Sequence, residues 1–130
     1  NMARAITHEL REHDFVLCNV KGADVGGHDD KPQAKIDMIA RLDEMVAYLM
    51  QNLPQNTFLV LTADHSTPCA VMDHSGDPVP IVFHGPGVRT DRCERYDERS
   101  VTAGGLGRIR GIDIMKIITQ LMNVQDKFGA

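Results

Sequence analysis

The chain has 130 residues, a net charge of −4 and 42% hydrophobic residues. This length suits a single domain, residues 1–130, with enough apolar content for a hydrophobic core. The slightly acidic balance offers no basic surface, which argues against a nucleic-acid partner. No apolar run approaches the roughly 18 residues that a membrane span needs, so we expect no membrane association. Three unpaired cysteines and the lack of a signal-peptide pattern predict a cytoplasmic protein with reduced thiols.

The spacing of apolar residues predicts helices and strands that alternate along the chain. In chain order we expect a helix over residues 2–12, a strand over 15–20, a helix over 33–51, strands over 57–63 and 79–83, and a helix over 113–122. The segment 57–63 is apolar enough to be a central, parallel strand. Alternating strands and helices predict an α/β fold in which helices cover both faces of a parallel sheet.

Two carboxylates and three imidazoles gather just after the predicted strands. They are Asp24 and His28 after the strand over 15–20, Asp64 and His65 after the strand over 57–63, and His74 nine residues later. Ligands of open α/β sheets bind beyond the carboxyl ends of strands. Nitrogen and oxygen donors in this mixture suit zinc, manganese, iron or cobalt better than calcium. The pattern predicts a two-metal site, and the alternative is a rim of unrelated polar residues.

The local sequence indicates how these side chains could converge. Gly26 and Gly27 predict a tight loop that turns Asp24 and His28 toward one ion. A short hairpin over residues 67–72 would return His74 to the same rim. Two neighbouring metal ions suit phosphoryl chemistry, because they neutralise the phosphate and stabilise the attacking and leaving oxygens.

Five blocks along the chain carry a family resemblance. They are Asn19-Val-Lys-Gly-Ala-Asp-Val-Gly-Gly-His28, Leu61-Thr-Ala-Asp-His-Ser-Thr-Pro68, Asp73-His-Ser-Gly-Asp-Pro-Val-Pro80, Gly85-Pro-Gly-Val-Arg89 and Gly104-Gly-Leu-Gly-Arg-Ile-Arg-Gly111. Together they resemble the C-terminal part of the archaeal-type cofactor-independent (2,3-bisphosphoglycerate-independent) phosphoglycerate mutases of the alkaline phosphatase superfamily. The resemblance implies a three-layer α/β/α sandwich with a mostly parallel sheet, of which this chain is an incomplete, metal-binding part.

The resemblance also implies roles for the clustered side chains. Asp24, His28 and His74 would hold a first divalent ion, and Asp64 and His65 would help to hold a second, with manganese, zinc, cobalt or magnesium as the metals. Members of the family are glycolytic isomerases, so the resemblance implies the interconversion of 3-phosphoglycerate and 2-phosphoglycerate through a phosphoserine.

The chain departs from the family pattern in one large respect. The nucleophilic serine of the family lies in an N-terminal segment, and neither Ser66 nor Ser75 matches its motif, so we expect this chain alone to be inactive. Arg108 and Arg110, on the glycine-rich loop, are candidates for binding a phosphorylated substrate or are simply surface charges.

Two other functions stay open from the sequence. One is a related phosphotransferase or phosphonate enzyme of the same superfamily, such as a phosphopentomutase or a so-called phosphonopyruvate decarboxylase. The other is a non-catalytic, stand-alone metal-binding remnant. If the chain is part of a longer enzyme, we expect the strand over 15–20 to expose an unpaired sheet edge through which the chain can self-associate.

Overall fold

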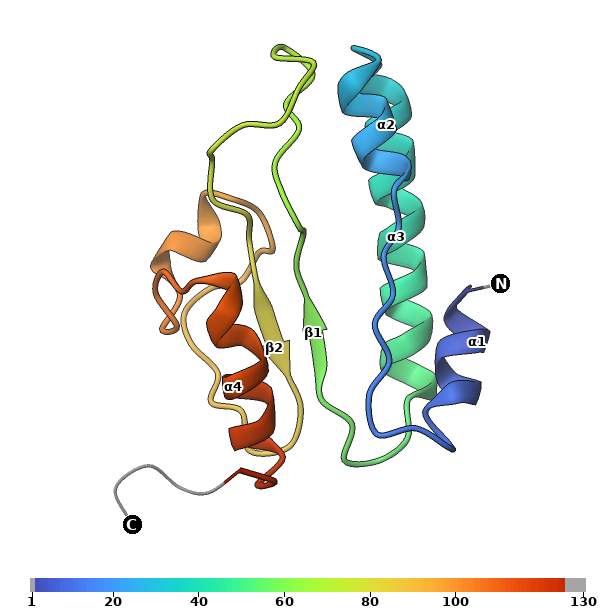
Figure 1. Cartoon of the computed structure of the whole chain (residues 1–130), viewed down its shortest axis with the longest axis vertical. Coiled ribbons are helices and arrows are strands. Elements are labelled where there is room, and N and C mark those ends of the chain that lie inside the picture. The colour runs from blue at the N-terminus through green and yellow to red at the C-terminus, as the bar shows by residue number, and fades with distance from the viewer. Residues whose placement is uncertain (1, 126–130) are drawn as a thin grey trace. The chain divides into compact units, whose positions relative to one another are not determined.

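A computed structural model describes residues 2–125 of the chain. The element order is α1, α2, α3, β1, β2, η1 and α4 (Figure 1). The chain forms two compact units. The first contains residues up to Gln55 together with His65–Asp77, and the second contains Asn56–Asp64 together with the residues from Pro78 onward.

The first unit is built on the long helix α3, Pro32–Asn52. Its amphipathic sequence and the proline in its first turn explain both its length and its start. The helices α1, Met2–Glu9, and α2, Gly22–His28, both pack against α3, and Figure 1 shows them at opposite ends of it. Ala3 of α1 and Leu49 of α3 are buried. The three helices expected from the apolar spacing near residues 2–12, 33–51 and 113–122 are therefore present in the chain as α1, α3 and α4.

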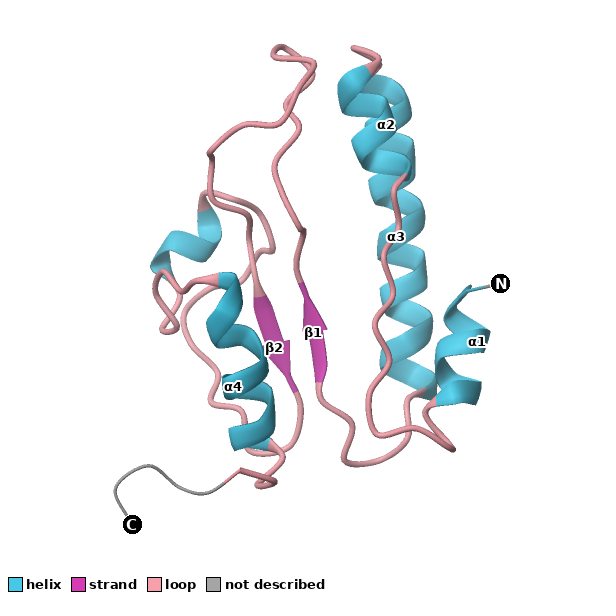
Figure 2. Cartoon of the chain, in the orientation of Figure 1, coloured by secondary structure: helices cyan, strands magenta, loops and turns pink. Residues whose placement is uncertain are grey.

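The expected strand over residues 15–20 is wrong. These residues are drawn as a loop that links α1 to α2 (Figure 2). A strand needs a neighbouring strand to complete its backbone hydrogen bonds, and the sheet of the described residues consists of two other segments, within residues 57–63 and 79–84. The side chain of Leu17 is consequently 82% exposed.

The glycine-rich loop expected around Asp24 is instead the short helix α2. Glycine is a poor helix former, so tertiary packing stabilises this helix rather than propensity. A Cβ at Gly26 would lie 3.0 Å from the backbone nitrogen of Lys35 on α3. Gly26 therefore serves the close packing of α2 against α3 rather than a tight turn.

Residues 65–77 run out and back, as the sequence predicted for the approach of His74. An isolated antiparallel bridge joins Ser66 to Ser75, and the Ser75 amide donates to the Ser66 carbonyl at 2.9 Å. At the turn, the Met72 amide donates to the Pro68 carbonyl at 3.0 Å, and Met72 has a positive φ of 55°. We refer to residues 65–77 as the hairpin loop.

The second unit contains a two-stranded sheet. The strands β1, Leu59–Leu61, and β2, Val82–His84, pair antiparallel with Val60 opposite Phe83. The parallel pairing expected for these segments is wrong, because the connection between them carries no crossover helix, which parallel neighbours usually require. The unit continues with the 3-10 helix η1, Ser100–Ala103, and the helix α4, Gly111–Leu121.

Both strands are shorter than the sequence predicted. Pro80 lacks an amide donor, and β2 begins only at Val82. The hydroxyl of Thr62 donates to the Pro80 carbonyl at 3.1 Å, beyond the end of the ladder. Within residues 2–125, the helices are each too short or too polar to cross a bilayer.

Candidate metal centre

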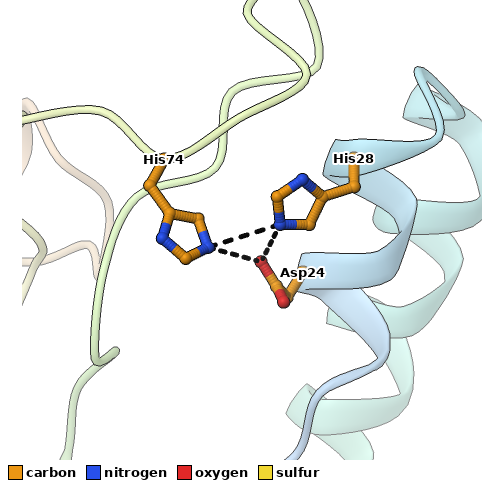
Figure 3. A group of neighbouring side chains, drawn as sticks. All are labelled: Asp24, His28 and His74. Carbon is orange, nitrogen blue, oxygen red and sulfur yellow. Dashed lines mark hydrogen bonds and ion pairs between the residues drawn. The ribbon is translucent and has the colours of Figure 1, made fainter.

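Asp24 and His28 lie on one face of α2, because they are four residues apart in a helix. Asp24 Oδ1 and His28 Nε2 are 3.4 Å apart. Figure 3 shows both side chains pointing away from the helix axis toward the hairpin loop. The helix achieves the convergence that the sequence analysis assigned to a loop.

His74 completes a group of three donors from the hairpin loop (Figure 3). Its Nε2 lies 3.3 Å from His28 Nε2 and 3.9 Å from Asp24 Oδ1. Donor atoms that bind one ion at about 2.0–2.1 Å with tetrahedral angles lie roughly 3.3 Å from one another. The three distances of 3.3, 3.4 and 3.9 Å therefore fit a single divalent ion with little movement.

The ring of His28 is oriented by the turn of the hairpin loop. His28 Nδ1 lies 3.1 Å from the Met72 carbonyl oxygen. A carbonyl only accepts, so Nδ1 carries the proton and the lone pair of the neutral ring is on Nε2, the atom that faces Asp24 and His74. A hydrogen bond from the second ring nitrogen to a carbonyl is the usual support of a metal-binding histidine.

His65 lies beside this group and stacks on His74, with ring centroids 3.7 Å apart. Its Nδ1 is 3.0 Å from the hydroxyl oxygen of Thr67, which itself lies 2.7 Å from Asp24 Oδ1. The Thr67 hydroxyl, and after it the imidazoles of His28, His65 and His74, hold the pKa of Asp24 below its ordinary value of 3.8, against the opposing effect of desolvation. A carboxylate that stays ionised in this way suits cation binding.

The remaining predicted site residues lie in the second unit. Asp64 is exposed and directly follows the segment that contains β1. Arg108 is exposed, and Arg110 caps α4, where its Nε lies 3.4 Å from Asp113 Oδ2. Of the five predicted metal ligands, the first unit thus brings together Asp24, His28 and His74, with His65 alongside.

The sequence analysis missed three residues that support the group. They are Thr67, whose hydroxyl contacts Asp24 and His65, Met72, whose carbonyl contacts His28, and Lys35, whose Nζ donates to the Thr67 carbonyl at 2.6 Å. A threonine two residues after a predicted ligand was a visible signal. The other two contacts depend on the approach of segments distant in sequence, and nothing local marks them.

The three clustered donors could thus hold one metal ion, and three protein ligands are the number found in many catalytic zinc sites. A family model described as the Metalloenzyme superfamily matches residues 1–121. The chain therefore belongs to this superfamily.

Similar proteins carry a more specific description. The chain is 49% identical over 129 residues to the 2,3-bisphosphoglycerate-independent phosphoglycerate mutase of Pyrococcus abyssi, and 54% identical over 127 residues to that of Methanoculleus marisnigri. Each match covers 98% of this chain, but only 32% and 30% of the relatives. The solved structure of PH0037 protein from Pyrococcus horikoshii matches with a TM-score of 0.94 and 47% identity, over 98% of this chain and 39% of that one. The chain therefore spans about a third of the length of the curated relatives that it matches.

Proposed function

We propose that the chain supplies the metal-binding part of a cofactor-independent phosphoglycerate mutase. The observation that carries the proposal is the convergence of Asp24, His28 and His74 to donor distances of 3.3–3.9 Å. The names of the similar proteins supply the substrate class, a phosphorylated small molecule, and the reaction, an intramolecular phosphoryl transfer.

In this proposal, Asp24, His28 and His74 hold one divalent ion, and Asp64 and His65 contribute to a second. A bound divalent ion would offset the negative charge of the phosphoryl group as it is transferred. Asp24 contributes a carboxylate that stays ionised, and His28 contributes Nε2 because its other ring nitrogen is engaged by Met72. Manganese, zinc, cobalt and magnesium are the metals to be tested.

The proposal assigns the nucleophile to a part of the enzyme other than this chain. Neither Ser66 nor Ser75, the serines that follow the proposed ligand histidines, matches the motif of the family's nucleophile. The Ser75 hydroxyl donates to Asp77 Oδ2 at 2.7 Å, and Ser66 is held in the backbone bridge to Ser75. An enzyme that works through a phosphoserine cannot form its intermediate without an activated serine.

We also propose that the second unit contributes Arg108 and Arg110 to substrate binding, and that the extended residues 15–20 join the mostly parallel sheet of a three-layer α/β/α sandwich. Two features support these roles. The guanidinium groups of Arg108 and Arg110 suit a phosphate. The segment 15–20 is a loop without turns or bends that exposes the apolar side chains of Phe15 and Leu17.

Isothermal titration with manganese and zinc tests the metal site. We expect the His74→Ala variant to bind at least about tenfold more weakly than the wild-type chain, because it loses one of three protein ligands. His13→Ala is the matched control, since His13 is exposed on the same unit and contacts only Glu9 among the ion pairs of the described residues, at 3.5 Å. Equal affinity for wild type and His74→Ala would remove His74 from the site.

A coupled enolase assay tests the reaction. We expect the chain with added manganese to give no turnover of 3-phosphoglycerate at an enzymatic rate, and metal-bound water to support at most a weak phosphatase activity. Normal turnover would contradict the assignment of the nucleophile to another part and would direct attention to Ser66 and Ser75. Turnover of a phosphopentose or a phosphonate instead would point to the related enzymes of the superfamily.

A further inference from the structure

Thr67 is the one buried polar residue among those described, with 4% of its surface exposed. Its Oγ1 lies 2.7 Å from Asp24 Oδ1 and 3.0 Å from His65 Nδ1. It therefore bridges a proposed ligand of the first ion and a proposed ligand of the second. A hydroxyl has one proton to donate, so when it lies between two such groups it can donate to only one of them and must accept from the other.

The direction of each hydrogen bond follows from the chemistry of the groups. An ionised carboxylate can only accept, so the single proton of the Thr67 hydroxyl goes to Asp24. The hydroxyl can then only accept from His65, which must carry a proton on Nδ1. In the neutral form of that ring the lone pair is on Nε2, which is the form that can bind a metal ion.

We propose that Thr67 is a positioning residue of the metal centre, which orients Asp24 and selects the Nδ1-protonated tautomer of His65. The inference rests on the proposed metal site, but it concerns a residue that is not itself a ligand. It parallels the role of the Met72 carbonyl, which selects the same tautomer for His28 at 3.1 Å.

The main chain of Thr67 is held as firmly as its side chain. Its carbonyl oxygen accepts from Lys35 Nζ on α3 at 2.6 Å. On the other side, Gly27 of α2 lies so close that a Cβ there would overlap the same carbonyl oxygen. Thr67 thus ties the hairpin loop to both helices, and a hydroxyl in so fixed a place can define the positions of the two groups that it contacts.

The test compares Thr67→Val, which keeps the shape and removes the hydroxyl, with Thr67→Ser, which keeps the hydroxyl. Thr7→Val is the matched control, because the Thr7 hydroxyl donates to the Arg4 carbonyl within α1 at 3.0 Å. Titration with manganese or zinc should show a loss of about 10- to 100-fold in affinity for Thr67→Val, as is typical for removal of an outer partner. Thr67→Ser and Thr7→Val should stay within roughly threefold of wild type, since the hydroxyl contact to Asp24 and His65 is kept in both.

A second readout does not involve metal. Nitrogen-15 NMR of the histidine rings in the metal-free wild-type chain at about pH 8, above the ordinary imidazole pKa of about 6.5, should show His65 protonated on Nδ1. Thr67→Val should shift this ring toward the other tautomer. The proposal is overturned if wild-type His65 carries its proton on Nε2, or if Thr67→Val binds metal as wild type does.

The two readouts keep this proposal distinct from the proposed function. If the wild-type chain bound no metal, the proposed metal site would be refuted. The tautomer of His65 would still test the role of Thr67, because that measurement is made without metal. If Thr67→Val does not fold, the tautomer of His65 in the wild-type chain and the metal affinity of Thr67→Ser test the role of Thr67 instead. A Thr67→Ser variant as weak as His74→Ala would show that the side chain acts by packing and would overturn the role of the hydroxyl.

Discussion

Replacing Gly27 by alanine would insert a methyl group into the contact between α2 and the hairpin loop. A Cβ at this position overlaps the Thr67 carbonyl oxygen and lies 3.0 Å from the Thr67 Cγ2. The overlapping atom belongs to the backbone, and it also accepts a hydrogen bond from Lys35 Nζ at 2.6 Å. Its displacement would therefore cost free energy. The hairpin loop would have to move away from α2, and His74 would move with it.

The expected size of the effect combines two opposing contributions. Inserting a group into a close-packed contact costs about 1–3 kcal/mol, whereas alanine in place of glycine within a helix stabilises by up to about 1 kcal/mol. We therefore expect Gly27→Ala to lower the free energy of unfolding by about 1–2 kcal/mol. Metal affinity should fall by roughly tenfold, because the donors of α2 and the hairpin loop separate.

Gly22→Ala is the matched control on the same helix. The nearest atoms to a Cβ there are Cε, Sδ and Cγ of Met38, a flexible side chain that can adopt another rotamer. We expect this variant to be neutral or slightly stabilising, and to bind metal as wild type does. Urea unfolding followed by circular dichroism, with metal titration, measures both. If Gly27→Ala proved as stable and as tightly binding as Gly22→Ala, the close contact between α2 and the hairpin loop would be refuted.

Three further predictions concern the rest of the chain. Leu49 is 3% exposed and Met50 49% exposed. Leu49→Ala should therefore lower the free energy of unfolding by about 2–4 kcal/mol, whereas Met50→Ala should change it by less than about 0.5 kcal/mol. Equal effects of the two variants in urea unfolding would contradict the placement of Leu49 in the core. The backbone amide and hydroxyl of Ser100 lower the pKa of Asp97, so its contribution to stability is present above the ordinary value of 3.8 and is lost as the pH falls through the lower, folded-state pKa. Unfolding measured from about pH 5 down to about pH 2.5 should therefore show a shallower acid loss for Asp97→Asn than for wild type, and parallel curves would exclude this role. Because Leu17 is 82% exposed, sedimentation velocity should show concentration-dependent self-association that Leu17→Asp reduces, and a wild-type monomer at all concentrations would rule it out.

The sequence alone determined the helices with strong apolar periodicity and the residues of the candidate metal centre. The pattern over residues 33–51 predicted α3 almost to its ends, because apolar spacing and an N-terminal proline are local properties. Asp24, His28 and His74 were recognisable as candidate ligands from residue type and family resemblance, and the first unit brings them together.

Only the tertiary structure decided which backbone conformation presents these groups. Gly26 and Gly27 indicated a loop by local propensity, but packing against Lys35 and Thr67 makes them part of a helix. The apolar residues 15–20 indicated a strand, yet a strand exists only with a hydrogen-bonded neighbour, which periodicity does not reveal. Thr67 acquired its place between Asp24 and His65 only because the hairpin loop and α2 meet. A contact between residues 43 positions apart in the chain depends on the packing of whole elements, and no local pattern encodes it.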